Sequence, residues 1–127
     1  MSVKISFQAS LGYTEWPVAD VITSLKGLGY DGIEWGTTHF DPEKGLAACR
    51  NVVDATREAG LEVCRIFAHE DLVSLDDAER KARIDRTVAV IEMAGECGAS
   101  NVGAMSGPAP WDPASPKIPA DISEGAA

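Results

Sequence analysis

The stretch "GLGYDGIEW", residues 27–35, decides the fold class, because it joins the end of a helix to a short strand. Gly29 suits a helix C-terminus, where a left-handed backbone favours glycine. The same order returns in "EAGLEVCRIF" (58–67) and "ECGASNVGAM" (96–105), and the closing glycines lie 31 and then 38 residues apart (60 − 29 and 98 − 60). Such a repeat predicts parallel strands joined by right-handed helical crossovers.

Apolar residues with helical spacing fill the intervals between the expected strands. We expect Pro17 and the Asp41–Pro42 pair to begin the first two helices, and Asp76 with Glu79 to cap the third. The expected buried faces are Val18, Val21, Ile22, Leu25 and Leu28; Leu46, Cys49, Val52, Val53 and Thr56; and Ile84, Val88, Ile91 and Ala94 or Gly95. With a first strand over residues 3–8, the predicted order is βαβαβαβ.

The composition changes after the expected fourth strand, where residues 108–127 hold five of the seven prolines. We therefore predict one structured domain over residues 1–107, followed by a Pro-rich loop or disordered tail. The sequence "DISEGAA" leaves a second interpretation open, in which Asp121 or Ser123 caps the start of a fourth helix.

The charge balance excludes several classes of partner. With 11 Lys+Arg against 20 Asp+Glu, the chain carries a net charge of −9, which repels nucleic-acid backbones and anionic membrane surfaces. We find no apolar run long enough for a membrane-spanning helix. The three cysteines are odd in number and lack CxxC spacing, so we predict reduced thiols and a cytoplasmic location.

The two faces of the expected strands differ, because side chains alternate across a strand. One face carries Ile33, Ile66 and similar apolar residues, whereas the other carries Ser6, Gln8, Glu34, Arg65 and His69. An open sheet would bury the polar set against apolar helices at a cost, but a barrel interior accommodates it. We therefore predict an α/β fold, a parallel (βα)3β half of a TIM (β/α)8 barrel followed by a Pro-rich tail.

Three phrases over residues 3–107 resemble the xylose-isomerase-like TIM barrels. "SLKGLGYDGIEW" (24–35) resembles the second strand of that family and "REAGLEVCRI" (57–66) its third. "ERKARIDRTVAVIEMAGECGASNV" (79–102) resembles the third helix with the fourth strand. The family includes sugar phosphate isomerases and epimerases, hydroxypyruvate isomerases, inosose-processing enzymes and, more distantly, endonuclease IV.

The resemblance implies part of a metal-dependent sugar or sugar-phosphate isomerase or epimerase. In the complete enzyme a carboxylate would remove a proton next to a carbonyl, and a divalent metal (Mn, Mg, Co or Zn) would stabilise the enediolate. The family's barrel has roughly 250 residues, and its metal ligands come from strands five to eight. We therefore expect no metal ligands in this N-terminal half, no catalytic residue, and no activity from this chain alone.

Five residues are candidates for contacting a substrate, and each has a structural alternative. Glu34 either lies near a ligand or only pairs with Arg65. His69 either contacts substrate hydroxyls or a metal, or bonds to its neighbours Glu70 or Asp71. His39 closes over a substrate or is a solvated loop residue. The remaining candidates are Gln8, a hydroxyl partner like Ser6, and Trp16, which with Tyr13 forms an apolar wall of a sugar site or packs the loop.

Two further functions remain open besides the enzyme fragment. Two exposed edges of a four-stranded parallel sheet invite pairing, so the chain is alternatively a self-associating half-barrel that binds without catalysis, as a homodimer. The last alternative is a non-functional truncated product. The partners we expect are a small sugar or sugar phosphate, and neither nucleic acid nor a membrane.

Overall fold

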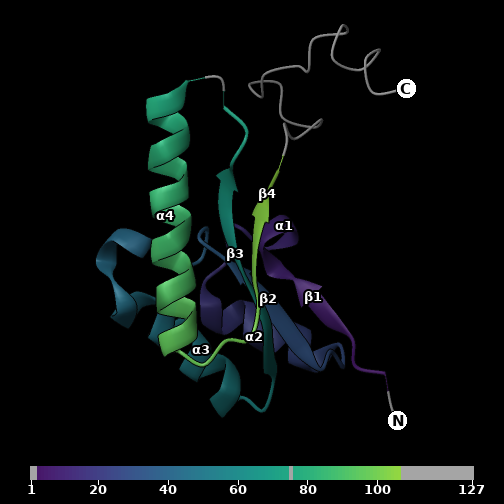
Figure 1. Cartoon of the computed structure of the whole chain (residues 1–127). Helices are drawn as coiled ribbons and strands as arrows, with labels where there is room; N and C mark the ends of the chain where they lie inside the picture. The colour runs from purple at the N-terminus through teal and green to yellow at the C-terminus, as the bar shows by residue number, and fades with distance from the viewer. Residues whose placement is uncertain (1–2, 75, 107–127) are drawn as a thin grey trace, which may run out of the picture.

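The computed structural model describes residues 3–74 and 76–106, and it confirms the predicted parallel sheet (Figure 1). The strands follow one another in the order β1-β2-β3-β4, and all neighbours pair in parallel. The elements are β1 (Ser6–Gln8), α1 (Ala9–Gly12), α2 (Val18–Gly27), β2 (Gly32–Gly36), η1 (Pro42–Lys44), α3 (Leu46–Glu58), β3 (Glu62–Asp71), α4 (Asp77–Glu96) and β4 (Val102–Met105). The tail predicted over residues 108–127 lies outside the described residues.

The helices α2, α3 and α4 pack against one face of the sheet and enclose a single apolar core (Figure 1). Trp35 of β2 is fully buried there, and its indole Nε1 donates a hydrogen bond of 2.8 Å to Thr56 Oγ1 on α3. Thr56 in turn donates to the Val52 carbonyl. The predicted faces of α2 and α3 are buried except at the first residue of each and at Leu28.

The predicted face of α4 is wrong except at Ala94, which is buried as expected. Ile84, Val88 and Ile91 are 44%, 46% and 50% exposed, whereas α4 buries Thr87, Val90, Met93 and Ala94. Both sets have helical spacing, so periodicity alone does not choose between them. The packing of α4 against β3 decides between them, since it buries the set that contains Val90. On the same side of α4, Arg86 pairs with Glu70 near the end of β3. The predicted N-cap is confirmed, since Asp76 accepts from the Glu79 amide at 2.9 Å.

The first strand and two connections also differ from expectation. Strand β1 begins only at Ser6, and Val3 and Ile5 are exposed rather than covered by helices. The segment after β1, expected as a loop, contains the short helix α1. Asp41 and Pro42 begin the 3-10 helix η1, and α3 starts separately after Gly45, whose φ of 74° interrupts the helical path.

The register of β3 shifts by one residue near its start. Val63 pairs with Ile33 and Arg65 with Glu34, so Cys64 is the extra residue of a bulge. Although Val63 precedes Arg65 by two residues, the bulge places it on the opposite face, against the core. Beyond the bulge the polar residues return to the face that α2, α3 and α4 leave uncovered, which we call the open face. Gly103 of β4 lies there under Phe67, whose ring leaves no room for a Cβ.

Candidate functional site

An ion pair between a buried carboxylate and a half-exposed guanidinium stands at the centre of the open face. Gln8, Glu34 and Arg65 are register partners across β1, β2 and β3. The Arg65 guanidinium approaches Glu34 Oε2 at 2.6 Å through Nη2 and at 2.7 Å through Nε. Glu34 is only 7% exposed, whereas the Arg65 side chain is 41% exposed. The predicted pairing of these two residues is therefore confirmed, and the pair holds two neighbouring strands in fixed register.

His69 lies further along β3 than Arg65, near the C-terminal end of the sheet. Its Nδ1 is 3.2 Å from Thr37 Oγ1, and its backbone amide donates to the same hydroxyl at 3.4 Å. The predicted alternative of a bond to Glu70 or Asp71 is not seen, because Glu70 pairs with Arg86 through both oxygens. Burial lowers the pKa of His69 below 6.5, and the charge of His39 lowers it further.

The ring of His69 occupies the space where a side chain of residue 36 would lie. A Cβ built on Gly36 would come within 2.2 Å of His69 Cε1 and 2.7 Å of Ser10 Cβ. Glycine is therefore required at this point of β2 for the ring to reach the sheet. Ser10 belongs to α1, and its hydroxyl accepts a 3.3 Å hydrogen bond from Gln8 Nε2. The polar cluster thus consists of Gln8, Ser10, Glu34, Arg65 and His69.

The structure separates the other two candidates from this cluster. His39 packs edge-on against Trp35, whose side chain faces the helices, and its Nε2 lies 2.9 Å from the Tyr13 carbonyl oxygen. Trp16 packs edge-on against Tyr13 and is 49% exposed. Tyr13 itself packs on Phe7 in the helix-side layer. His39 therefore ties the loop after β2 to the loop after β1, whereas Trp16 packs within the loop after β1.

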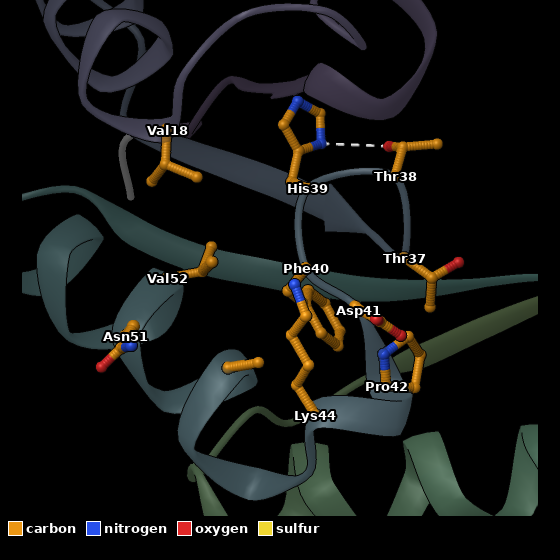
Figure 2. Close-up of a pocket in the computed structure, with 11 residues that line it drawn as sticks. Val18, Thr37, Thr38, His39, Phe40, Asp41, Pro42, Lys44, Asn51 and Val52 are labelled. Atoms are coloured by element: carbon orange, nitrogen blue, oxygen red, sulfur yellow. Dashed lines mark hydrogen bonds between the residues drawn. The ribbon is translucent and has the colours of Figure 1, made fainter.

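A cavity of about 530 Å³ opens beside His39 on the helix side of the sheet. Figure 2 shows Thr38 and His39 at one end, Asn51 and Val52 of α3 on its wall, and Lys44 near its floor. Neither this cavity nor a second of about 390 Å³ between η1 and α4 is lined by Glu34 or His69. The polar cluster is therefore a feature of the sheet surface and not of these cavities.

The residues present do not fit a metal ion. Over residues 3–74 and 76–106, no three His, Cys, Asp or Glu side chains gather closely enough to hold one. Two ligands can come from Glu34 and His69 at most, and Glu34 Oε2 is already engaged by Arg65. In the same part of the chain, no helix combines the length and apolar character that crossing a membrane requires.

Sequence reasoning missed one member of the cluster, Ser10, and two residues that contact His69, Gly36 and Thr37. Alternation along β2 puts Gly36 on the face of Glu34, which was the available signal. The closeness of Ser10 and His69 depends on how α1 folds back over β2, and local sequence does not encode that approach.

The comparisons with known proteins agree with this geometry. The family model of the xylose isomerase-like TIM barrel matches residues 22–124. Among solved structures, a 3-keto-D-glucoside 4-epimerase from E. coli in its apo form has a TM-score of 0.61 at 19% identity. A probable 3-DHS dehydratase of petrobactin synthesis from Bacillus anthracis has a TM-score of 0.61 at 17% identity.

These similarities cover most of this chain but a minor part of the solved structures. The matches include 80% and 83% of this chain, but only 37% of the epimerase and 39% of the dehydratase. None of the curated proteins matches the chain in sequence. The sheet is accordingly one part of a TIM barrel, with the strands in barrel order. Because the family model matches well over half of its residues, the chain belongs to the xylose isomerase-like TIM barrel family.

Proposed function

We propose that this chain forms the N-terminal part of a sugar isomerase or epimerase and supplies one wall of its substrate site. The single observation that carries the proposal is the polar cluster, which extends from Glu34 and Arg65 at the centre of the open face to His69 near the C-terminal end of the sheet. In TIM barrels the catalytic and binding groups lie at that end of the strands. The family match and the two solved relatives, an epimerase and a dehydratase, support the sugar chemistry.

The chain's own residues would bind and orient a substrate. The Glu34–Arg65 pair fixes the wall, while Gln8 and Ser10 present polar groups that suit sugar hydroxyls. The neutral imidazole of His69 lies beside them, since burial lowers its pKa. We propose a small sugar or sugar phosphate as the substrate, and retain His39 and Trp16 as candidates for outer contacts with it.

The reacting groups are proposed to lie outside this chain. The divalent metal that the family resemblance implies finds no fitting set of ligands in the described residues, so we place its site in later strands. Because the chain spans 37% to 39% of the two relatives, we propose that it is inactive alone. We retain the cytoplasm as the proposed location, consistent with three free cysteines.

Proton exchange tests this function. The reading frame beyond Ala127 would be sequenced and the entire product expressed, with residues 1–127 alone as the control. Ketoses and sugar phosphates would be incubated in D2O with added Mn²⁺, and deuterium next to the carbonyl would be followed by NMR. We expect exchange with the entire product and none with the control. A frame that closes at Ala127, or an entire product without exchange on any substrate, would contradict the proposal.

A second candidate function, self-association, is favoured by the exposed stripe on α4. Ile84, Val88 and Ile91 lie on α4, which covers the edge strand β4. At the opposite edge, Val3 and Ile5 precede β1 and are also exposed. Strands β1 and β4 both leave one side unpaired, and two copies would provide the eight strands of a closed barrel. We propose this as the alternative to an enzyme fragment.

Sedimentation equilibrium separates the two candidates. A self-associating module has twice the 13.4 kDa mass of one chain, and Ile91→Glu should return it to a monomer, because a charge on the stripe opposes burial. Ala47→Glu on the exposed surface of α3, away from both edges, is the matched control. A wild-type monomer at high concentration would exclude self-association.

A further inference from the structure

Helix α4 carries an apolar stripe that the described residues leave half-exposed. The stripe consists of Ile84, Val88 and Ile91, which recur at the i, i+4 and i+7 positions. Single apolar residues are common on protein surfaces, but helix formation does not call for this row, since valine and isoleucine are weaker helix formers than alanine or leucine. Apolar residues at this spacing are typical of a helix face that packs against another element.

The stripe faces away from η1. Arg86 and Ala89 line the cavity between η1 and α4, so they mark the side of α4 that is turned toward η1. At 3.6 residues per turn, the stripe lies roughly 160° around the helix from the mean direction of these two residues. It therefore borders the side of α4 on which the described residues place no further helix.

Basic side chains show that the helices follow one another in chain order. Lys26, in the last turn of α2, donates to the Ala59 carbonyl at the C-terminus of α3 at 2.7 Å. Arg57, in the last turn of α3, donates to the Cys97 and Gly98 carbonyls at the end of α4 at 2.8 and 2.9 Å. The three helices cover the same face of the sheet (Figure 1). Because crossovers in parallel sheets share one hand, a helix after β4 would lie beside α4, against the stripe.

The sequence after β4 contains a helix-start signal that the structure confirms elsewhere in the chain. At the start of α4, the Asp76 carboxylate accepts from the Glu79 amide at 2.9 Å. Residues 121–124, "DISE", repeat this Asp-x-x-Glu order, which is the spacing of a capping box. The segment lies outside the described residues, but the family model matches through residue 124, which is 19 residues beyond the end of β4 (124 − 105). The match to the family thus includes this segment.

We propose that residues 121–127 begin a helix that packs on the stripe of α4 and buries Ile84 and Val88. Ile122 and Ala126 lie four residues apart, so they would share the face that contacts the stripe. The stripe is about 10 Å long, at 1.5 Å per residue, and seven helical residues have a similar length. The segment is tethered to β4, which gives it an effective concentration on the order of millimolar. This tether favours the segment over a second copy of the chain as the occupant of the stripe.

Nuclear Overhauser effects between methyl groups test this contact in the whole chain of residues 1–127. We expect effects between Ile122 and Ile84 or Val88 in methyl-labelled protein, with relative intensities that do not change on dilution. A mixture of labelled and unlabelled chains separates contacts within one chain from contacts between two. Effects that join the stripe to a second chain would assign it to self-association and overturn the proposal. The absence of any effect between Ile122 and the stripe would also overturn it.

Variants in α4 supply a second measurement. Val88→Asp places a charge in the stripe and should move the Ile122 methyl signal to its position in the urea-unfolded chain, because a buried charge opposes packing. Ala89→Asp is the matched control, since it introduces the same residue at the next exposed position, on the side turned toward η1. It should leave the Ile122 signal in place. An unchanged Ile122 signal in the Val88→Asp variant would contradict the proposed contact.

Variants of the cap test the start of the helix. Asp121→Ala removes the capping carboxylate and should speed hydrogen exchange of the Glu124 amide about fivefold. Asp121→Asn keeps a capping side chain and should preserve the slow exchange. The same exchange rate in the Asp121→Ala variant and the wild type would refute this start.

The outcomes are separate from those of the proposed function, because this proposal concerns packing within residues 1–127. Deuterium exchange by the entire product without a contact of Ile122 retains the enzyme and removes the helix. The contact without deuterium exchange retains the helix and removes the enzyme.

Discussion

Replacement of Arg65 by Met is the sharpest test of the open face. The substitution keeps an unbranched aliphatic side chain beside Phe67 but removes the guanidinium, which lies 5.6 Å from the centre of that ring. Glu34 then keeps its carboxylate at 7% exposure without a counter-charge. The fall in the free energy of unfolding therefore measures the cost of leaving this carboxylate in the sheet without a counter-charge.

The magnitude follows from the burial of the two partners. Removing one partner of a fully buried ion pair costs about 3–5 kcal/mol, and a hydrogen bond to a charged group contributes about 1.5–3 kcal/mol. The Arg65 side chain is 41% exposed, so water can enter beside Glu34 when the guanidinium is gone. We therefore expect a loss below the range for a fully buried pair and within the range for a charged hydrogen bond, about 2–3 kcal/mol in the free energy of unfolding.

Urea denaturation followed by tryptophan fluorescence provides the assay, because Trp35 is fully buried. A loss of 2–3 kcal/mol corresponds to a fall in Tm of about 10 °C or more for a domain of this size. The matched control is Lys81→Met, which removes an exposed ion pair with Asp85 and should cost less than about 1 kcal/mol. Adding Glu34→Gln to Arg65→Met should restore part of the stability. Equal losses in the Arg65 and Lys81 variants would refute the reasoning.

Three other expectations follow from the same structure. Gly36→Ala should lower the free energy of unfolding by about 1–3 kcal/mol in urea titration, because the added Cβ meets His69 and Ser10. Gly27→Ala is the control: its added Cβ meets nothing within 4 Å, so the change should be neutral or stabilising. The pKa of His69 is lowered in the folded protein, so the stability that its neutral ring contributes is present above pH 6.5 and is lost as the pH falls below that value. His69→Gln should therefore flatten the fall in Tm between pH 7 and pH 5. An unchanged slope of Tm against pH would count against this account. Burial and the adjacent Cys97 thiol raise the pKa of Cys49 to about 12. Iodoacetamide at pH 8 should therefore modify Cys49 only after unfolding in guanidinium, as peptide mass spectrometry would show. Rapid alkylation of Cys49 in the native protein would disprove this expectation.

The order of strands and helices was predictable because it depends on local and repeated signals. Glycines 29, 60 and 98 all have positive φ, between 72° and 83°, and glycine adopts that conformation without the steric cost of a Cβ. Alternation along β2 and β3 also placed Glu34 and Arg65 on one face, where they do pair. These features need only the chain's own periodicity and the conformational preferences of single residues.

Tertiary structure decided what periodicity left ambiguous. Helix α4 has two sets of apolar or small residues at helical spacing, and its packing against β3 buries the one containing Val90 while exposing the one containing Ile84. The bulge at Cys64 likewise depends on the pairing of β3 with β2. Both outcomes arise from contacts between segments far apart in the chain. Local sequence patterns do not encode such contacts.

The same division applies to the candidate site. The sequence by itself determined the parallel βα repeat, the polar face of the strands and the pairing of Glu34 with Arg65. Only the tertiary structure brought Ser10 and His69 over Gly36 and left Glu34 Oε1 and His69 Nε2 without partners. It also moved His39 to the helix side, against Trp35. The physical reason is that alternation assigns a side chain to a face, whereas the folding of loops and short helices decides which neighbours it meets.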